Sequence, residues 1–137
     1  MANTNDNDSA LQWSASSTKS LNSTSRFDSD AKAINADAHT VVLQITCDNS
    51  GTPASGDYVD NWIKWSSDGS TFDTDEHAEY LGRLDTYGSN DPGEDPCTKT
   101  YEIAAVGKQS YKLTSKANQG GTRAVTISAV HNEARSS

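Results

Sequence analysis

The chain has 137 residues, of which 33% are hydrophobic, and its formal net charge is −8. This length suits one domain, and the low hydrophobic content predicts a core built from short strands. No apolar run approaches the roughly 18 residues of a membrane-spanning helix, so a membrane partner is not expected. The N-terminal sequence MANTNDNDSA has neither the basic nor the apolar part of a secretion signal, which predicts synthesis in the cytoplasm.

Residues 1–37 are predicted to form an extended polar N-terminal arm. The first ten residues are small and polar, and the segment LQWSASSTKSL that follows could form an edge strand anchored by Trp13. Residues 22–40 are mixed in character, with Phe27, Ile34 and a possible short turn through DSDAKAINADA. Such an arm would gain order on binding a partner and could wrap a large surface.

Two clear strands follow the arm. The first alternates in hydropathy and places one set of side chains on a single face: Val41, Leu43, Ile45 and Cys47. After a loop over residues 50–56, the second strand runs from Tyr58 to Ser66. Its two faces are both apolar, one with Val59, Ile63 and Trp65 and the other with Tyr58 and Trp62. Such a strand is expected at the centre of a sheet or beneath a neighbouring subunit.

The rest of the chain continues the same pattern. A tight turn is predicted over residues 67–74, and residues 75–85 fit either one helical turn or an irregular strand. Later strands are predicted over 98–105, 109–115 and 125–129, with loops at 88–97 and 117–122. About six or seven strands separated by turns predict an all-β fold, an antiparallel sandwich of jelly-roll-like or Ig-like type. We assign it to residues 38–131, followed by a polar tail at 132–137.

Charge is distributed unevenly along the chain. Residues 48–95 hold twelve acids and two bases, net −10, whereas residues 96–137 hold two acids and six bases, net +4. The acidic middle would repel phosphates, so no nucleic-acid partner is expected. Regions of opposite charge also suit contacts between copies.

The sequence offers little reactive chemistry. Cys47 and Cys97 lack a CxxC or Cys/His context, so no zinc site is expected, and free thiols are favoured over a disulfide. The segment TDEHAE, with Asp68 and Asp73 nearby, could bind calcium, but a solvated acidic loop is the favoured interpretation. No nucleophile, paired-carboxylate or phosphate-binding motif is recognisable, so we expect no enzyme activity, no cofactor and no resident metal.

Three tryptophans and five tyrosines could form a sugar-stacking platform, although most are expected in the core or in subunit contacts. Trp62 and Trp65 are predicted on opposite faces of one strand. They could not stack together on one flat ligand, which weakens the sugar-binding interpretation.

Two segments, LQITCDNSGTPASGDYVDNWIKWSSDGSTFDTDEHAEYLGRLDT and YKLTSKANQGGTRAVTISAV, resemble small structural proteins of tailed-phage heads. The resemblance covers roughly residues 40–130 and implies a capsid decoration, or cement, protein. Such a protein would bind the outside of an assembled capsid and stabilise contacts between neighbouring major capsid subunits. The resemblance further implies a place on the virion surface and self-association as a trimer or dimer.

Contact residues for this role are predicted from side-chain type and position: Trp13, Leu21, Arg26, Phe27, Trp62 and Arg83. If the arm provides the contact, deleting residues 1–27 should abolish capsid binding and leave the fold intact. Two other classes remain open. One is a carbohydrate-binding β-sandwich module, and the other is a subunit of an extracellular filament or adhesin that exchanges strands between copies.

Overall fold

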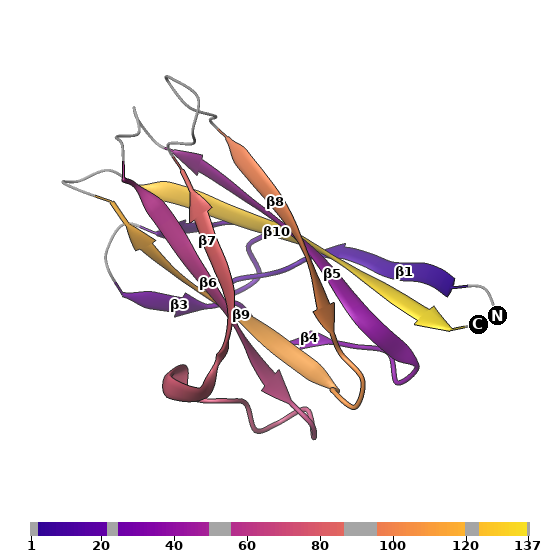
Figure 1. The fold of residues 1–137 in the computed structure, drawn as a ribbon. Helices are drawn as coiled ribbons and strands as arrows, with labels where there is room; N and C mark the ends of the chain where they lie inside the picture. The colour runs from indigo at the N-terminus through magenta and orange to yellow at the C-terminus, as the bar shows by residue number, and fades with distance from the viewer. Residues whose placement is uncertain (1–2, 22–24, 50–55, 87–95, 120–123, 137) are drawn as a thin grey trace.

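The structure, a computed structural model, describes residues 3–21, 25–49, 56–86, 96–119 and 124–136. Two antiparallel sheets pack face to face, which confirms the predicted all-β sandwich (Figure 1). Among the described residues, no helix is long and apolar enough to cross a membrane.

The first sheet has the strand order β1-β10-β5-β8, and β2 also pairs with β10. Its strands are β1 (Asn3–Ala10), β2 (Lys19–Leu21), β5 (Ala38–Asn49), β8 (Cys97–Ala104) and β10 (Val125–Ser136). The second sheet has the order β3-β9-β6-β7, and β4 also pairs with β9. Its strands are β3 (Arg26–Asp28), β4 (Lys32–Ala33), β6 (Tyr58–Ser66), β7 (Glu79–Asp85) and β9 (Ser110–Asn118).

The core lies between the sheets and follows the alternation read from the sequence. In β5 the predicted face is buried, and in β6 Val59, Ile63 and Trp65 point inward. β6 is a central strand, between β9 and β7, as its two apolar faces predicted. The core also includes Leu11, Trp13 and Leu21 from the N-terminal segment.

The N-terminal segment differs from the predicted arm. Its described residues contribute β1 and β2 to one sheet and β3 and β4 to the other. Leu11 and Leu21 are buried at 1% and 0% exposure, so this segment fills the core instead of reaching outward. The prediction missed this for two reasons. β2, β3 and β4 have only two or three residues, which is too short to show alternation. β1 has the sequence NTNDNDSA, in which every residue except the last is polar.

The predicted polar tail is likewise part of a strand. β10 extends to Ser136 and pairs with β1 on one side and β5 on the other. Asn3 is paired with Ser136, so the first strand and the end of β10 lie side by side (Figure 1).

Two ambiguous parts of the sequence are resolved. Residues 75–85 form both predicted alternatives in succession, a short 3₁₀ helix η1 (Asp75–His77) followed by β7. Most of the loops predicted at 50–56 and 88–97, and part of the turn predicted at 117–122, lie outside the described residues.

One open side of the sandwich is closed between edge strands β7 and β8. Gly82 in β7 has φ +144°, and a Cβ built there would lie 3.6 Å from the ring of Tyr101 in β8. Glycine adopts this backbone conformation more readily than residues with a side chain, and the Tyr101 ring lies at ordinary van der Waals distance from this position. Tyr101 is half-buried against the core at this position.

The two cysteines are free thiols, and they are direct partners across β5 and β8. The Cys97 thiol donates to the Cys47 carbonyl oxygen at 3.6 Å. Burial, and then the neighbouring Cys97, raise the pKa of the Cys47 thiol. The Cys47 thiol therefore stays protonated and inert while the sandwich is closed.

Candidate interaction face

The outward face of the sheet β3-β9-β6-β7 gathers aromatic and charged side chains. Alternation along β6 turns Tyr58, Asp60, Trp62 and Lys64 outward, opposite to the buried set. Pairing with β7 sets Tyr80 across from Trp62 and Arg83 across from Asp60. The face therefore combines side chains from strands that are distant in sequence.

Six of these residues form a connected surface, which we call the aromatic–arginine patch: Arg26, Tyr58, Asp60, Trp62, Tyr80 and Arg83. The Trp62 and Tyr80 rings lie 5.6 Å apart, and the Arg26 guanidinium lies 3.9 Å from the Trp62 ring centre. Contacts of this kind between cations and aromatic faces are attractive, and they fix the orientation of both groups.

The other half of the patch is built in the same way. The Arg83 guanidinium lies 3.5 Å from the Tyr58 ring centre, and its Nε is 3.7 Å from Asp60. The Tyr80 hydroxyl donates to Asp60 at 2.7 Å. Tyr80 is nevertheless 52% exposed and the Arg83 side chain 50% exposed, so the patch is ordered and still accessible.

The acidic loop after β6 folds back over this sheet and does not extend freely into solvent. The Asp73 amide donates to the Trp65 carbonyl at 3.0 Å, and the Trp65 amide donates to the Asp73 carboxylate at 3.1 Å. Lys112 of β9 lies 4.7 Å from the Phe72 ring centre. Together these contacts hold residues 72–75 against the sheet.

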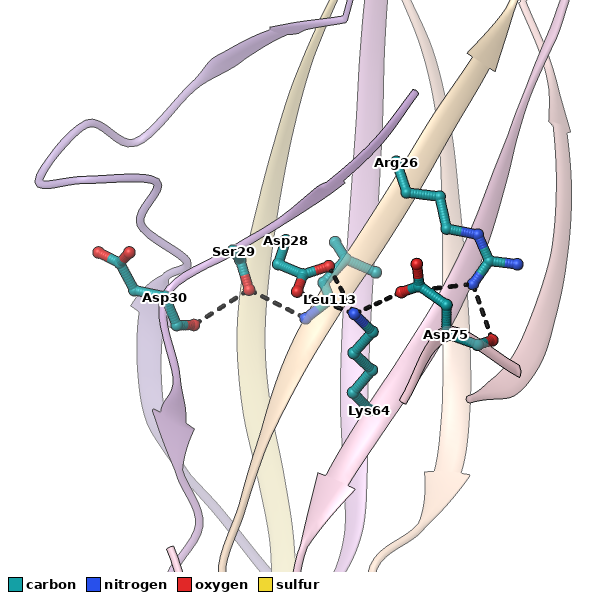
Figure 2. A network of polar contacts seen from close by, with 7 residues as sticks. All are labelled: Arg26, Asp28, Ser29, Asp30, Lys64, Asp75 and Leu113. Atoms are coloured by element: carbon teal, nitrogen blue, oxygen red, sulfur yellow. Dashed lines mark hydrogen bonds and ion pairs between the residues drawn. The ribbon is translucent and has the colours of Figure 1, made fainter. Parts of the chain in front are cut away.

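Lys64 fastens the end of this loop, as Figure 2 shows. Its ammonium lies 2.6 Å from Asp75 and 2.9 Å from Asp28, which joins the loop to β3 across β9. Lys64 is only 9% exposed. Burial opposes its charge, but hydrogen bonds to Asp75 and Asp28 outweigh that effect and raise the pKa of Lys64.

Arg26 takes part in both the loop contact and the patch. Its guanidinium donates to the Asp75 carbonyl at 2.9 Å while lying over Trp62.

Hydrogen bonds also hold the chain to β9 just after the last residue of β3. The Ser29 amide donates to the Leu113 carbonyl at 2.7 Å. The Leu113 amide donates to the Ser29 hydroxyl at 2.9 Å (Figure 2).

The six predicted contact residues divide into two core residues, three members of the patch, and Phe27, which belongs to neither set. Trp13 and Leu21 are core residues, at 5% and 0% exposure, so the prediction that they contact a partner is incompatible with this arrangement. Arg26, Trp62 and Arg83 belong to the patch. Phe27 follows Arg26 in the chain and is half-buried, with the Lys19 ammonium 4.8 Å from its ring centre.

Sequence reasoning missed Tyr58, Asp60 and Tyr80 as members of this face. The alternation in β6 gave the orientation of Tyr58, but the partner of each residue depends on the β6–β7 register. That register shifts between Asn61 and Trp62, which no local pattern indicated.

In the loop considered for calcium binding, the Asp68 carboxylate is already hydrogen-bonded by its neighbours in the chain. Asp68 accepts hydrogen bonds from the amides of Thr71 and Ser70, both at 2.8 Å, and from the Ser66 hydroxyl at 2.9 Å. These bonds lower the pKa of Asp68 to about 2. No group of three or more His, Cys, Asp or Glu side chains suited to a metal ion occurs in the part of the chain that the structure describes.

A pocket of about 400 Å³ opens between this loop and Lys108, and Trp65 and Phe72 contribute to its lining. Trp65 is 6% exposed and packs edge-on against Tyr111 inside the sandwich, whereas Trp62 lies on the outer face. The predicted opposite orientation of the two tryptophans is therefore correct. Little of the Trp65 ring is available for stacking on a sugar.

A second polar cluster lies inside the sandwich and joins its two sheets. The Tyr111 hydroxyl lies 2.7 Å from His131 Nδ1, and His131 Nε2 lies 2.9 Å from Glu133. The Asn35 side-chain amide donates to the same carboxylate at 2.7 Å. Tyr111, His131 and Glu133 are all at 0% exposure, so this triad is positioned to hold the sheets together and not to meet a substrate.

Comparisons with known proteins identify the fold. No protein-family model matches the chain, and no curated protein matches it in sequence. Among solved structures, the fold is similar to a chain from the acidic stable capsid structure of Helicobacter pylori bacteriophage KHP30. That likeness has 10% identity and a TM-score of 0.53, over 96% of this chain and 91% of that chain.

A fainter likeness, with 13% identity and a TM-score of 0.47, relates 93% of this chain to 16% of BtGH115A, a family GH115 4-O-methyl-alpha-glucuronidase specific for decorated arabinogalactans. The first likeness spans nearly the whole of both chains. The protein therefore has, over 96% of its length, a β-sandwich fold similar to that of a chain found in a phage capsid structure.

Proposed function

We propose that this protein is a structural component of a phage virion. It binds the outside of an assembled capsid and stabilises contacts between neighbouring major capsid subunits. The observation that carries the proposal is the likeness to a chain of a phage capsid structure over 96% of this chain and 91% of that one. The resemblance of residues 40–130 to phage-head proteins, noted from the sequence, points in the same direction.

The aromatic–arginine patch is the surface we propose for capsid contact. Trp, Tyr and Arg are the residue types that most often dominate binding energy in protein interfaces. Here Trp62, Tyr80 and Arg83 are already oriented by contacts within the protein. Side chains ordered before binding lose less conformational entropy when they meet a partner.

A cement role needs no catalytic group, and we propose none. It needs a rigid body and many modest contacts that add across a repeating surface. The clamped loop supplies rigidity beside the patch, because Lys64 ties Asp75 to Asp28. The protein would be made in the host cytoplasm and would work on the virion surface.

The test is co-sedimentation with shells assembled from the major capsid protein encoded beside this protein. Saturable binding together with a higher shell melting temperature is the expected result. Arg83→Ala and Tyr80→Ala should each weaken binding about tenfold, the loss expected from a contact worth slightly more than 1 kcal/mol. Both side chains are half exposed, so the fold should survive either change.

Lys99→Ala is the matched control. Lys99 is an exposed cation on edge strand β8 and lies 5.6 Å from the ring centre of Tyr101, but it belongs to the other sheet. The Lys99→Ala variant should bind shells as the unmodified protein does. Absence of binding at every stage of shell maturation would contradict the proposal. A glycan array and a strand-exchange assay would then test the carbohydrate-binding and filament hypotheses.

A further inference from the structure

A line of charged side chains crosses the outer face of the sheet β3-β9-β6-β7. Strand register places Arg26 of β3 opposite Lys116 of β9. Lys116 in turn lies opposite Asp60 of β6, and Asp60 lies opposite Arg83 of β7. We call the three cations of this line the cation row: Arg26, Lys116 and Arg83. They outnumber the one acid in the line, although the formal net charge of the chain is −8.

Lys116 is the member of the cation row without a partner. It points outward from β9, since Leu113 and Ala117 on the alternate positions point into the core. Among the described residues, no hydrogen bond, ion pair or ring contact involves its side chain. Its direct neighbour on β3 is another cation, Arg26. Like charges directly opposite each other destabilise a pair of strands, so the free protein bears an electrostatic cost at Lys116.

The two arginines of the row have acidic neighbours that are already bound by other groups. Arg26 lies 3.8 Å from the Asp75 carboxylate, which Lys64 contacts at 2.6 Å. Arg83 lies 3.7 Å from Asp60, which accepts a tyrosine hydroxyl at 2.7 Å. Among the described residues, one hydrogen bond uses the Arg26 guanidinium and none uses that of Arg83. Their other N–H groups can therefore donate to a carboxylate of another molecule.

The remaining acids on the strands of this sheet lie outside the line. Asp28 of β3 is bound by the Lys64 ammonium at 2.9 Å. Glu79 and Asp85 lie at the two ends of β7, and Asp85 is opposite Tyr58 and not opposite a member of the row. The excess of positive charge is therefore local to the cation row.

We propose that the cation row binds carboxylates on the surface of a neighbouring capsid subunit. This inference deepens the capsid role proposed above and rests on it. A carboxylate that reaches Lys116 offsets its repulsion with Arg26 and accepts charge-assisted hydrogen bonds. Lys116 and Arg83 lie on strands two apart, and strands are spaced by about 4.8 Å. The row therefore fits two acid side chains about 10 Å apart.

A long polyanion such as a nucleic acid fits this surface less well. Asp60 lies within the line, between Lys116 and Arg83, and would meet the phosphates of a continuous backbone. The net charge of −8 also repels such a chain as it approaches. Discrete carboxylates can contact the cations on either side of Asp60. A second copy of this chain would bring a further charge of −8 and meet the same repulsion.

Charge reversal at Lys116 tests the proposal in the shell co-sedimentation assay. Lys116→Glu should weaken binding at least about tenfold, because its carboxylate repels the acids of the partner. The melting temperature of the isolated variant should equal or exceed that of the unmodified protein, since glutamate opposite Arg26 replaces a repulsive pair by an attractive one. Poor binding by a variant of undiminished stability would exclude unfolding as the cause.

Lys99→Glu is the matched control, because it changes the net charge by the same amount on the other sheet. It should bind shells within about twofold of the unmodified protein. Raising the salt concentration from about 0.05 M to about 0.5 M should weaken the binding of the unmodified protein more than that of Lys116→Glu, because salt screens the attraction.

The outcomes separate this inference from the proposed capsid role. Shell binding that neither Lys116→Glu nor salt affects would overturn the inference and leave the capsid role intact, whereas no binding by the unmodified protein would overturn both. A lower melting temperature for Lys116→Glu would contradict the repulsion at this position. Two results would overturn the inference by identifying another occupant. One is binding of duplex DNA that Lys116→Glu abolishes, and the other is self-association of the isolated protein that the same variant abolishes.

Discussion

Lys64 and His131 are both buried ionisable side chains, but their pKa values are shifted in opposite directions. Lys64 keeps its charge because Asp75 and Asp28 contact its ammonium directly, and its pKa is raised. His131 is fully buried, and burial lowers its pKa although the bond to Glu133 opposes that effect; nearby Lys32 also lowers it. The neutral ring satisfies both partners, with Nε2 donating to the Glu133 carboxylate and Nδ1 accepting from Tyr111.

This arrangement predicts a loss of stability in mild acid. The unfolded chain binds a proton at His131 near the ordinary pKa of 6.5, whereas the folded chain resists protonation. The stabilising contribution of neutral His131 is therefore present above pH 6.5 and declines as the pH falls below that value. The melting temperature should fall between pH 7 and pH 5.

His131→Gln is the variant that isolates this effect. Glutamine keeps a donor and an acceptor but does not titrate, so the variant should be less stable overall and should lose part of the decline between pH 7 and pH 5. His77→Gln, at an exposed site, should retain the full decline. An identical pH profile for His131→Gln and the unmodified protein would show that another group is responsible.

At the scale of the elements, the N-terminal strands hold the two sheets together. β1 and β2 pair with β10, and β3 and β4 pair with β9. The chain thus contributes strands to both sheets within its first 33 residues, and Leu11 and Trp13 are buried between β1 and β2. Deleting residues 1–27 would remove part of the core and is not a clean test of partner binding.

Leu21→Ala measures this contribution directly. Leu21 is at 0% exposure, and removing a buried leucine side chain costs about 2–5 kcal/mol of unfolding free energy. Urea unfolding should show a loss in that range, whereas Val106→Ala, at a 74% exposed site, should change stability by less than about 0.5 kcal/mol. A loss at Leu21 as small as that at Val106 would restore the arm hypothesis.

The sequence predicted the strands that alternate clearly. β5 and β6 were found with their buried faces because most of the inward positions in each strand are apolar, with Val41, Leu43 and Ile45 in β5. In β6 the apolar inward residues are Val59, Ile63 and Trp65. β1 was not predicted as a strand because it is polar and pairs at the edge of a sheet, where no apolar face is required. The end of β10 was predicted as a polar tail because its inward positions are occupied by the polar residues His131 and Glu133. These two side chains are bonded to each other inside the sandwich.

The candidate site was predictable only in part, for a related reason. Residue type pointed to Arg26, Trp62 and Arg83, and the structure places all three on one face. Leu21 and Trp13 have equally suitable side chains but face the core. Side-chain type identifies residues that can bind a partner, whereas strand pairing over long sequence separations decides which of them reach the surface.

For the whole molecule, the position of a strand within its sheet determines how easily that strand should open. β8 is an edge strand bonded to β5 on one side, whereas β5 is enclosed between β8 and β10. Local opening starts at edges, where fewer contacts hold the backbone. Cys97 on β8 and Cys47 on β5 report on this difference because both thiols are buried and free.

Single-cysteine variants make that difference measurable. In native conditions a thiol reagent should react slowly with both, since a buried thiol must first become exposed. Cys97 in the Cys47→Ser variant should react faster than Cys47 in the Cys97→Ser variant. Equal rates would indicate that both become exposed in a single global unfolding event, and faster labelling of Cys47 would contradict the edge-first order.

The position of β10 has a consequence for synthesis on the ribosome. β10 is translated after all the other strands of these two sheets, yet it is the strand to which β1, β2 and β5 all pair. Until residues 125–136 have been translated, those three strands have no neighbour on that side, and one whole sheet cannot assemble. Such long-range pairing slows folding and leaves unpaired edges exposed while the chain waits. The nascent protein should therefore depend on chaperones that shield extended segments, and its yield should respond to translation speed and chaperone supply more than to changes on its finished surface.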